Sequence, residues 1–300
     1  MTSQERTFAL FTVTWRGDIF AFKQLCNSID RWMPDVRHIV AVDHSDVALF
    51  SEFAGPFREI VDCSEFLPSL HEFSLFGRRL WWKFPFHIIR GWIYQQLSKI
   101  AIVSTFDEAA IVIVDSDVVF IRKLETGDIF DNSSVVYFRN LGAPSGPPSQ
   151  SSRWHDAAAT TLGLPMRGYT GADYISGAVI WSTDVVRAML HRIESIHGGK
   201  WLKPLLRHLR ISEYVTYGVF CDHVSGPHRT LISPTPAELA HCSWNYDFDE
   251  SGGVELFVSE LPDDAAAVLV QSNLNMAPAR REEVFARIAE KRRVLTASSA

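Results

Sequence analysis

Cysteine and basic residues are both scarce in this sequence. Its 300 residues include four cysteines, Cys26, Cys63, Cys221 and Cys242, with no CxxC pair and no short zinc-ligand spacing. We therefore expect free thiols rather than a disulfide framework or a zinc centre. Lysine and arginine number 29 against 35 acidic residues, which gives a net charge of −6. This balance argues against the basic surface needed for non-specific nucleic-acid binding, so we expect no nucleic-acid partner.

Long apolar stretches are also absent. No run approaches the ~18 apolar residues of a membrane-spanning helix, and the start MTSQERTFALFTVTW lacks the basic and apolar regions of a signal peptide. We therefore expect a soluble, cytoplasmic protein. Hydrophobic residues make up 47% and charged residues 21% of the chain, which is typical of a globular protein and not of a disordered, collagenous or coiled-coil one. The sequence does not indicate an oligomeric state.

Short apolar runs alternate with helix-like stretches along the chain. Alternation of this kind predicts an α/β fold with a mostly parallel, mixed sheet and helices on both faces. We expect one catalytic domain over residues 1–278, then a charged helix and tail over 279–300. The predicted strands are Phe8–Trp15, His38–Val42, Ala110–Val114, Val135–Phe138, Tyr174–Trp181 and Ala267–Val270. The predicted helices are Asp18–Trp32, Phe86–Val103, Arg153–Leu162, Thr183–Ile196 and Arg280–Arg293, the last with its charges mostly in solvent.

Two segments between these elements bear on function. Leu141–Ser152 is rich in proline, glycine and serine, so we expect either a lid over a ligand or a plain surface connection. The run Ile111–Phe120, IVIVDSDVVF, places Asp115 and Asp117 after four apolar residues. Ligands of open α/β sheets bind at this end of a strand.

The two aspartates are spaced so that, in an extended chain, both carboxylates point the same way. They would repel each other unless one is protonated or a cation lies between them. Mg²⁺ or Mn²⁺ suits such oxygen ligands and also bridges phosphates. The alternative is that they only form a turn and cap.

Two enzyme classes place a DxD motif after such a strand. In haloacid-dehalogenase-type phosphatases the motif usually lies near the start of the fold, and the late apolar strand is followed by a Gly-Asp. Here Asp263 and Asp264 precede the late run Ala265–Val270 instead, which weakens that reading. The other class is the metal-dependent glycosyltransferases.

The helix before the DxD strand favours the second class. Within Gly91–Ile102, one arc of the helix holds Ile93, Leu97, Ile100 and Ala101. The opposite arc holds Trp92, Gln95, Gln96 and Lys99. Amides and an ammonium group suit sugar hydroxyls and phosphates, although the same face could simply be solvated.

At this point the chain resembles a bacterial family of largely uncharacterised glycosyltransferases with the GT-A fold. The resemblance covers about Phe8 to Leu274 and depends on the order of several blocks: G-W-x-x-Q-Q-x-x-K, DxD, Arg153–Pro165, Ala172–Ser182, Ile211–Gly218 and Val268–Leu274. More distantly, the layout is similar to glycosyltransferase family 8. The resemblance to the GT-A family implies a single GT-A-type, Rossmann-like domain. This domain would transfer a sugar from a nucleoside-diphosphate sugar, such as a UDP- or GDP-sugar, to a hydroxyl acceptor. A glycan, a lipid-linked intermediate or a natural product could be that acceptor.

The resemblance also implies roles for individual residues. Asp115 and Asp117 would hold Mn²⁺ or Mg²⁺, and Gln95, Gln96 and Lys99 would face the donor. The nucleotide would be bordered by Thr14, Asp18, Asp43, Asp46 and Ser116. The transferred sugar would be bordered by Asp173, Ser176 and Gly177, with possible late-strand contacts from Gln271 and Ser272.

Glu213 is the principal candidate for the chemistry, and Asp173 is its rival. Glu213 would deprotonate the acceptor in an inverting enzyme or stabilise positive charge at the anomeric carbon in a retaining one; otherwise it would only cap a helix or pair with Arg210. Many GT-A enzymes complete the metal site with a late histidine, but no histidine follows His241. His223, His228, His241 or water would then complete it. A sugar-nucleotidyltransferase, a DxD phosphatase and a non-catalytic sugar-binding protein remain as alternatives.

Overall fold

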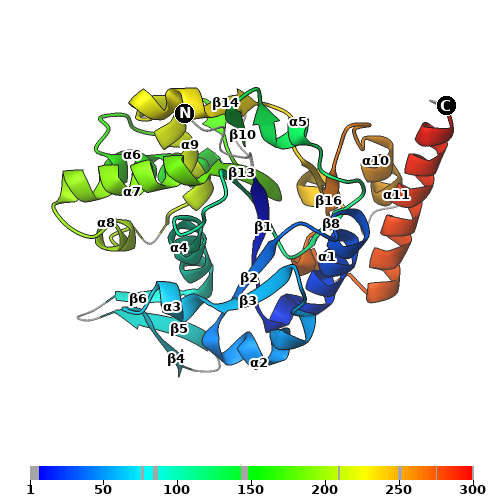
Figure 1. Cartoon of the computed structure of the whole chain (residues 1–300), viewed down its shortest axis with the longest axis horizontal. Helices are drawn as coiled ribbons and strands as arrows, with labels where there is room; N and C mark the ends of the chain where they lie inside the picture. The colour runs from blue at the N-terminus through cyan, green and yellow to red at the C-terminus, as the bar shows by residue number, and fades with distance from the viewer. Residues whose placement is uncertain are drawn as a thin grey trace.

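The computed structural model describes residues 7–75, 78–83, 87–142, 148–208, 210–248, 252–274 and 276–298. Its centre is a five-stranded sheet in the order β13-β7-β1-β2-β3 (Figure 1). Four of the strands are parallel, and β13 is antiparallel to β7. The predicted mixed, mostly parallel α/β sheet is therefore confirmed. Its strands are β1 (Phe8–Val13), β2 (His38–Val42), β3 (Arg58–Asp62), β7 (Ala110–Val114) and β13 (Ala178–Ser182).

Helices cover both faces of this sheet, as predicted. Successive side chains of a strand point to opposite faces of the sheet, so neighbouring residues of β1 belong to different hydrophobic cores. Phe11 shares one core with Leu97 of α4 (Gly91–Val103). Leu10 shares the other with Phe22 of α1 (Ile19–Trp32). Figure 1 shows α4 and α1 on opposite sides of the sheet. The remaining longer helices are α6 (Pro148–Leu162), α7 (Thr183–His197), α9 (Glu213–His223) and α11 (Pro278–Ser298). Short helices are α2 (Val47–Phe50), α3 (Cys63–Phe66), α5 (Thr126–Ile129), α8 (Leu202–Leu206) and α10 (Gly253–Ser259).

Smaller sheets are attached around the central one. Three of them have three strands each, in the orders β14-β10-β9, β15-β16-β8 and β4-β5-β6, and β11 pairs with β12 alone. Their strands are β4 (His71–Leu75), β5 (Arg78–Lys83), β6 (His87–Arg90), β8 (Val118–Phe120), β9 (Phe130–Asp131), β10 (Ser134–Phe138), β11 (Asn140–Leu141), β12 (Ala172–Asp173), β14 (Ile232–Thr235), β15 (Ala240–Cys242) and β16 (Ala267–Leu269).

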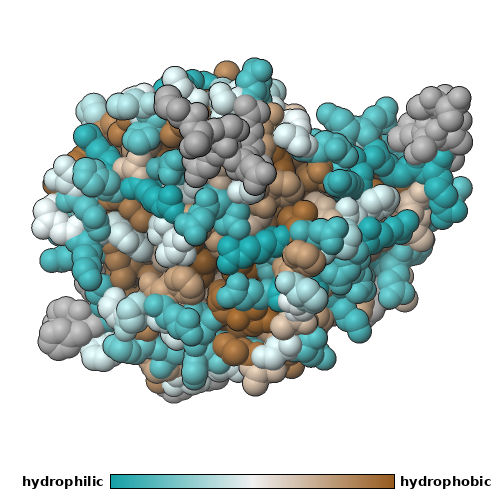
Figure 2. Space-filling model, viewed as in Figure 1, coloured by the Kyte–Doolittle hydropathy of each residue, from teal (hydrophilic) through white to brown (hydrophobic). Residues whose placement is uncertain are grey.

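The C-terminal helix α11 packs against α10 through a small core that contains Val284, Ile288 and Phe257. Hydrophilic side chains cover much of the arm that it forms at the right of Figure 2. In the part of the chain that the structure describes, no helix has the length and apolar character required to cross a bilayer.

Two predicted elements begin several residues later in the structure than expected. The strand expected over Tyr174–Trp181 begins only at Ala178, because the Asp173 carboxylate accepts the N–H groups of Tyr174 and Ile175 and turns the chain there. The helix expected from Phe86 begins at Gly91, since His87–Arg90 is strand β6, paired with β5.

The segment expected to be a loop, Leu141–Ser152, is also partly helical. Residues 143–147 lie outside the described part of the chain, and helix α6 already begins at Pro148. Whether residues 143–147 form a lid or a plain connection stays a prediction, while Pro148–Ser152 is helical and not part of a loop. Strand β3 and the β4-β5-β6 sheet were not predicted.

Candidate functional site

A cleft of about 310 Å³ lies where the DxD motif follows β7. Because β1 and β7 are parallel neighbours, the residues that follow both strands meet at this edge of the sheet. Helix α4 supplies one wall through its polar face, and the start of α9 supplies another. The lining residues include Asp18, Trp92, Gln95, Gln96, Lys99, Asp115, Ser116, Asp117, Trp154, Ile175, Ser212, Glu213, Tyr214 and Ser272.

The DxD segment forms a turn rather than the extended chain that we assumed. Asp115 follows β7, and the N–H of Val118, the first residue of β8, donates to the Asp115 carbonyl at 3.2 Å. Both carboxylates nevertheless line the cleft. The backbone N–H of Ser272 donates to Asp117 Oδ2 at 2.8 Å, and the Ser116 hydroxyl donates to Asp18 Oδ2 at 3.2 Å. The turn thus leads from the central sheet to β8 with both acidic groups held at the cleft.

Lys99 joins the acidic groups of the cleft into one network. Its Nζ lies 3.1 Å from Asp115 Oδ1, 3.1 Å from Glu213 Oε1 and 2.7 Å from the Tyr214 hydroxyl. The Tyr214 hydroxyl also donates to Asp115 Oδ1 at 3.3 Å. Lys99 and Glu213 are both buried. The ammonium group therefore holds two carboxylates, and Glu213 pairs with Lys99, whereas the sequence analysis considered Arg210 as an alternative partner.

Burial and charge shift the pKa values of this network. Burial alone would lower the pKa of Lys99, but Asp115, Tyr214 and Glu213 outweigh it and raise the pKa well above its usual range. Lys99 is therefore a cation at neutral pH. Burial, reinforced by the charge of Asp115, raises the pKa of Asp117 to about 6. Two carboxylates thus compete for charge at the DxD turn, as expected from their proximity.

This repulsion and the chemistry of the donor set fit a hard divalent cation. Asp115 Oδ1 is engaged by Lys99 and Asp117 Oδ2 by Ser272, so Asp115 Oδ2 and Asp117 Oδ1 would be the ligands. Among the described residues, no group of three or more histidine, cysteine, aspartate and glutamate side chains is arranged to hold a metal. Mg²⁺ keeps several waters at such sites, and water would complete the shell.

The histidines named as possible ligands do not lie at the DxD turn. His223 ends helix α9, and His228 is part of a short 3-10 helix. His241 Nε2 lies 3.0 Å from the Phe257 carbonyl oxygen. None of the three is among the described residues that line the cleft. The positions of these histidines do not support them as ligands, and completion of a metal site by water stays a prediction.

Two of the residues predicted to bind the nucleotide are engaged by arginines. Arg79, on strand β5, pairs with Asp43 and Asp46 at 3.0 Å each, and Arg16 pairs with Asp46 at 2.5 Å. Neither aspartate lines the cleft. Burial raises the pKa of Asp43 to about 7 despite the neighbouring Arg79. These contacts attach the β4-β5-β6 sheet to the carboxyl end of β2.

Other predicted residues lie behind the cleft surface. Thr14 is buried and its hydroxyl has no hydrogen-bond partner in the described residues. Asp173 is buried and caps the turn before β13. Ser176 donates to Glu238 Oε2 at 3.0 Å. At Gly177 we expected room for a ligand, but an added Cβ would lie 2.4 Å from a Leu269 methyl carbon, so a core side chain fills that space.

Sequence reasoning missed Arg281, although it is 4% exposed and supports the DxD turn. Its guanidinium donates to the Asp117 carbonyl at 2.9 Å, to Gln24 Oε1 at 2.6 Å and to the Val270 carbonyl. We expected the charges of the terminal helix to lie mostly in solvent. Arg281 precedes the buried Val284 by three residues and so lies on the same side of the helix. This spacing could have indicated that Arg281 is buried.

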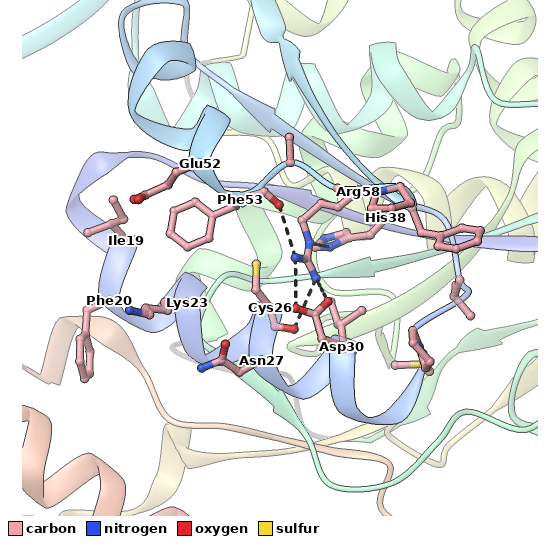
Figure 3. Close-up of a pocket in the computed structure, with 18 residues that line it drawn as sticks. Ile19, Phe20, Lys23, Cys26, Asn27, Asp30, His38, Glu52, Phe53 and Arg58 are labelled. Carbon is pink, nitrogen blue, oxygen red and sulfur yellow. Dashed lines mark hydrogen bonds and ion pairs between the residues drawn. The ribbon is translucent and has the colours of Figure 1, made fainter.

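A larger pocket, about 800 Å³, lies apart from this cleft, between α1 and the chain before β3 (Figure 3). Arg58 is its most polar feature. The guanidinium pairs with Asp30 at 2.5 Å, donates to the Cys26 and Phe53 carbonyls and contacts His38 Nδ1. None of the predicted site residues lines this pocket. Arg58, Asp30 and His38 are thus engaged with one another, and the pocket brings no paired carboxylates together as the DxD cleft does.

Comparisons with known proteins give a family and two distant structures. The model of a family described as "Family of unknown function (DUF6492)" matches residues 10–291. No curated protein matches the chain. Among solved structures, the galactosyltransferase LgtC in complex with donor and acceptor sugar analogues is 11% identical, with a TM-score of 0.46, covering 94% of this chain and 95% of its own. The bifunctional glycosyltransferase WbbM in its apo form is 13% identical, with a TM-score of 0.44, covering 96% of this chain and 52% of its own.

Proposed function

The chain belongs to the family DUF6492, and we propose that it is a glycosyltransferase. It would transfer a sugar from a nucleoside-diphosphate sugar, with UDP- and GDP-sugars as the first candidates, to a hydroxyl acceptor. The observation that carries the proposal is the convergence in one cleft of Asp115 and Asp117 with Lys99 and Glu213, which come from three separate parts of the sequence. A paired carboxylate site next to a buried cation and a third carboxylate fits a substrate with both a diphosphate and a sugar.

The reaction forms a bond between the acceptor oxygen and the anomeric carbon of the donor. It breaks the bond between that carbon and the diphosphate oxygen, and the hydroxyl proton is lost to a base. Asp115 and Asp117 would hold Mn²⁺ or Mg²⁺, which stabilises the departing diphosphate as a Lewis acid. Glu213 would accept the proton or stabilise charge at the anomeric carbon. Lys99 would position Asp115 and Glu213 rather than contact the donor, since both carboxylates already engage it.

Thermal unfolding tests the donor site. We expect the melting temperature to rise with one nucleoside diphosphate or its sugar conjugate, and only when Mn²⁺ or Mg²⁺ is present. A ligand that binds only the native state adds about 2.7 kcal/mol of stability at a hundred times its dissociation constant. Asp117→Ala should remove the metal-dependent shift and the transfer activity. Asp184→Ala is the matched control, because Asp184 is an exposed carboxylate on α7 that is paired with Arg187.

Each outcome of this measurement is informative. No metal-dependent shift with any nucleoside diphosphate would contradict the proposal. Consumption of a nucleoside triphosphate would identify a nucleotidyltransferase, and phosphate release without an acceptor would identify a phosphatase. Donor binding without transfer to any acceptor, unaffected by Glu213→Gln, would identify a sugar-binding protein.

A further inference from the structure

A second cavity, about 810 Å³, adjoins the DxD cleft. We call it the aromatic trough; Gln150, Trp154, Glu238, Trp244, Tyr246 and Gln271 are among the residues that line it. Trp154 and Ile175 line both the trough and the cleft, so the two share a wall. Gln271 lines the trough and the next residue, Ser272, lines the cleft. A molecule bound in the trough therefore reaches the edge of the cleft.

Aromatic rings line both the cleft and the trough. Trp92, in the cleft and 50% exposed, lies with its ring 6.2 Å from that of Trp154. Trp244 and Tyr246 also line the trough, and both are partly buried in the surrounding cores. The Tyr246 hydroxyl is fixed by Glu260 at 2.6 Å. Flat rings held by packing are suited to binding the apolar C–H faces of pyranose rings, while neighbouring polar groups bind their hydroxyls.

The polar groups of the trough restrict the charge of its occupant. Glu238 and Asp264 contribute carboxylates, and the described residues that line the trough include neither lysine nor arginine. Burial lowers the pKa of His241, so this side chain is neutral at pH 7. A phosphate, a carboxylate or a lipid diphosphate would meet like charge here without a cation to offset it. Asn140, Asn245, Gln150 and Gln271 are uncharged groups that match hydroxyls.

Glu238 has a fixed orientation in this wall. Its Oε2 accepts a hydrogen bond from the hydroxyl of Ser176, which is fully buried. The Cys242 side chain also bonds this carboxyl group, and its remaining lone pairs would accept from a sugar hydroxyl. Burial raises the pKa of Glu238, while the hydrogen bonds from Ser176 and Cys242 act to lower it. Ser176 is thereby a positioning residue for Glu238.

We propose that the aromatic trough binds the acceptor and that the acceptor is a neutral saccharide, with rings lying on Trp154 and Trp244 and a hydroxyl bound by Glu238. This inference rests on the proposed function, because it assumes that the cleft holds the donor. Of the acceptors considered from the sequence, it selects a glycan over a phosphorylated lipid-linked intermediate.

The test measures glycan binding directly, without catalysis. The full-length protein, labelled with a fluorophore, is applied to an array that contains neutral, uronic-acid-containing and phosphorylated glycans. We expect binding to a subset of the neutral glycans. Trp244→Ala and Glu238→Gln should each weaken it at least about tenfold, which corresponds to about 1.4 kcal/mol. Trp82→Ala is the matched control, because Trp82 is a partly exposed indole on β5, outside the trough.

The outcomes separate this proposal from the proposed function. Preference for phosphorylated or uronic glycans, binding to no glycan, or neutral-glycan binding that both variants retain would overturn the trough proposal. The nucleotide-dependent thermal shift of the wild type, measured separately, decides the proposed function. The same thermal shift, measured on Trp244→Ala, reports whether that variant is folded. If it is not, Glu238→Gln, which keeps the shape of the side chain, tests the trough in its place.

Discussion

At the residue scale, the buried Lys99 ammonium decides whether the acidic cleft is stable. It is shared by Asp115, Glu213 and the Tyr214 hydroxyl. Removing one partner of a buried ion pair lowers the free energy of unfolding by more than the intact pair contributes to it, because the remaining charge stays buried without a partner. The stability of the cleft is thus tied to the same charges as its proposed chemistry.

Lys99→Met is expected to lower the free energy of unfolding by about 3–5 kcal/mol in metal-free buffer, since it leaves two carboxylates without their cation. Urea denaturation measures this change. Adding Glu213→Gln to Lys99→Met should recover part of the loss, and Lys123→Met, at an exposed lysine, should have little effect. If the two substitutions in the cleft were simply additive, the network would not be coupled as described.

His155 makes the stability depend on pH. It is buried against the rings of Tyr169 and Tyr174, and its Nδ1 lies 2.8 Å from the Thr170 hydroxyl. Burial lowers the pKa of His155 to about 4. As the pH falls from 6.5 towards 4, the unfolded chain takes up a proton that the folded chain does not, so stability is lost across this window.

The stability advantage of the wild type over His155→Gln should therefore shrink by about 3 kcal/mol between pH 8 and pH 4, as a pKa difference of ~2.5 implies. Urea unfolding of both proteins at each pH gives this difference, and the comparison cancels the contributions of other titrating groups. A difference that stays constant with pH would show that His155 is not held neutral.

At the element scale, helix α11 is joined to the DxD turn through Arg281 and not only through its apolar face. The guanidinium bridges Asp117, Val270 and Gln24, which lie on the DxD turn, after β16 and on α1. The helix thus ties together three separate parts of the chain behind the cleft.

Arg281→Met is expected to destabilise the protein by about 2–4 kcal/mol, because buried carbonyl oxygens lose their charged donor. It should also weaken metal-dependent nucleotide binding, since the Asp117 backbone is no longer held. Arg280→Met, at a neighbouring arginine paired with Glu283 near the surface, should stay within about 0.5 kcal/mol. Calorimetry of the three proteins is the measurement; equal melting temperatures would rule out this role of Arg281.

At the scale of the whole molecule, the sequence predicted the central sheet far better than its attachments. β1, β2 and β7 are buried on both faces and therefore stand out as continuous apolar runs. β3 is an edge strand with the sequence REIVD, and the β4-β5-β6 sheet mixes charges with aromatic residues. Neither has the apolar run that marks a buried strand, so both were missed.

The site follows the same division. The helix period placed Gln95, Gln96 and Lys99 on one face, and the strand pattern placed Asp115 and Asp117 at a strand end. That they border one site was implied only by the family resemblance, and all five residues line the cleft. The arginine partners of Asp43 and Asp46 and the position of Arg281 depend on pairings between distant segments. A single sequence contains no local signal for such pairings.

The Arg281 contact also concerns the time at which the cleft can form during synthesis. Asp117 enters the growing chain early, but the guanidinium that binds its carbonyl comes from α11, long after it. A nascent chain that has not yet been extended through residue 281 holds the DxD turn without this donor. All five strands of the central sheet are therefore synthesised before the turn can gain its final hydrogen bonds, and the order of translation delays maturation of the DxD turn.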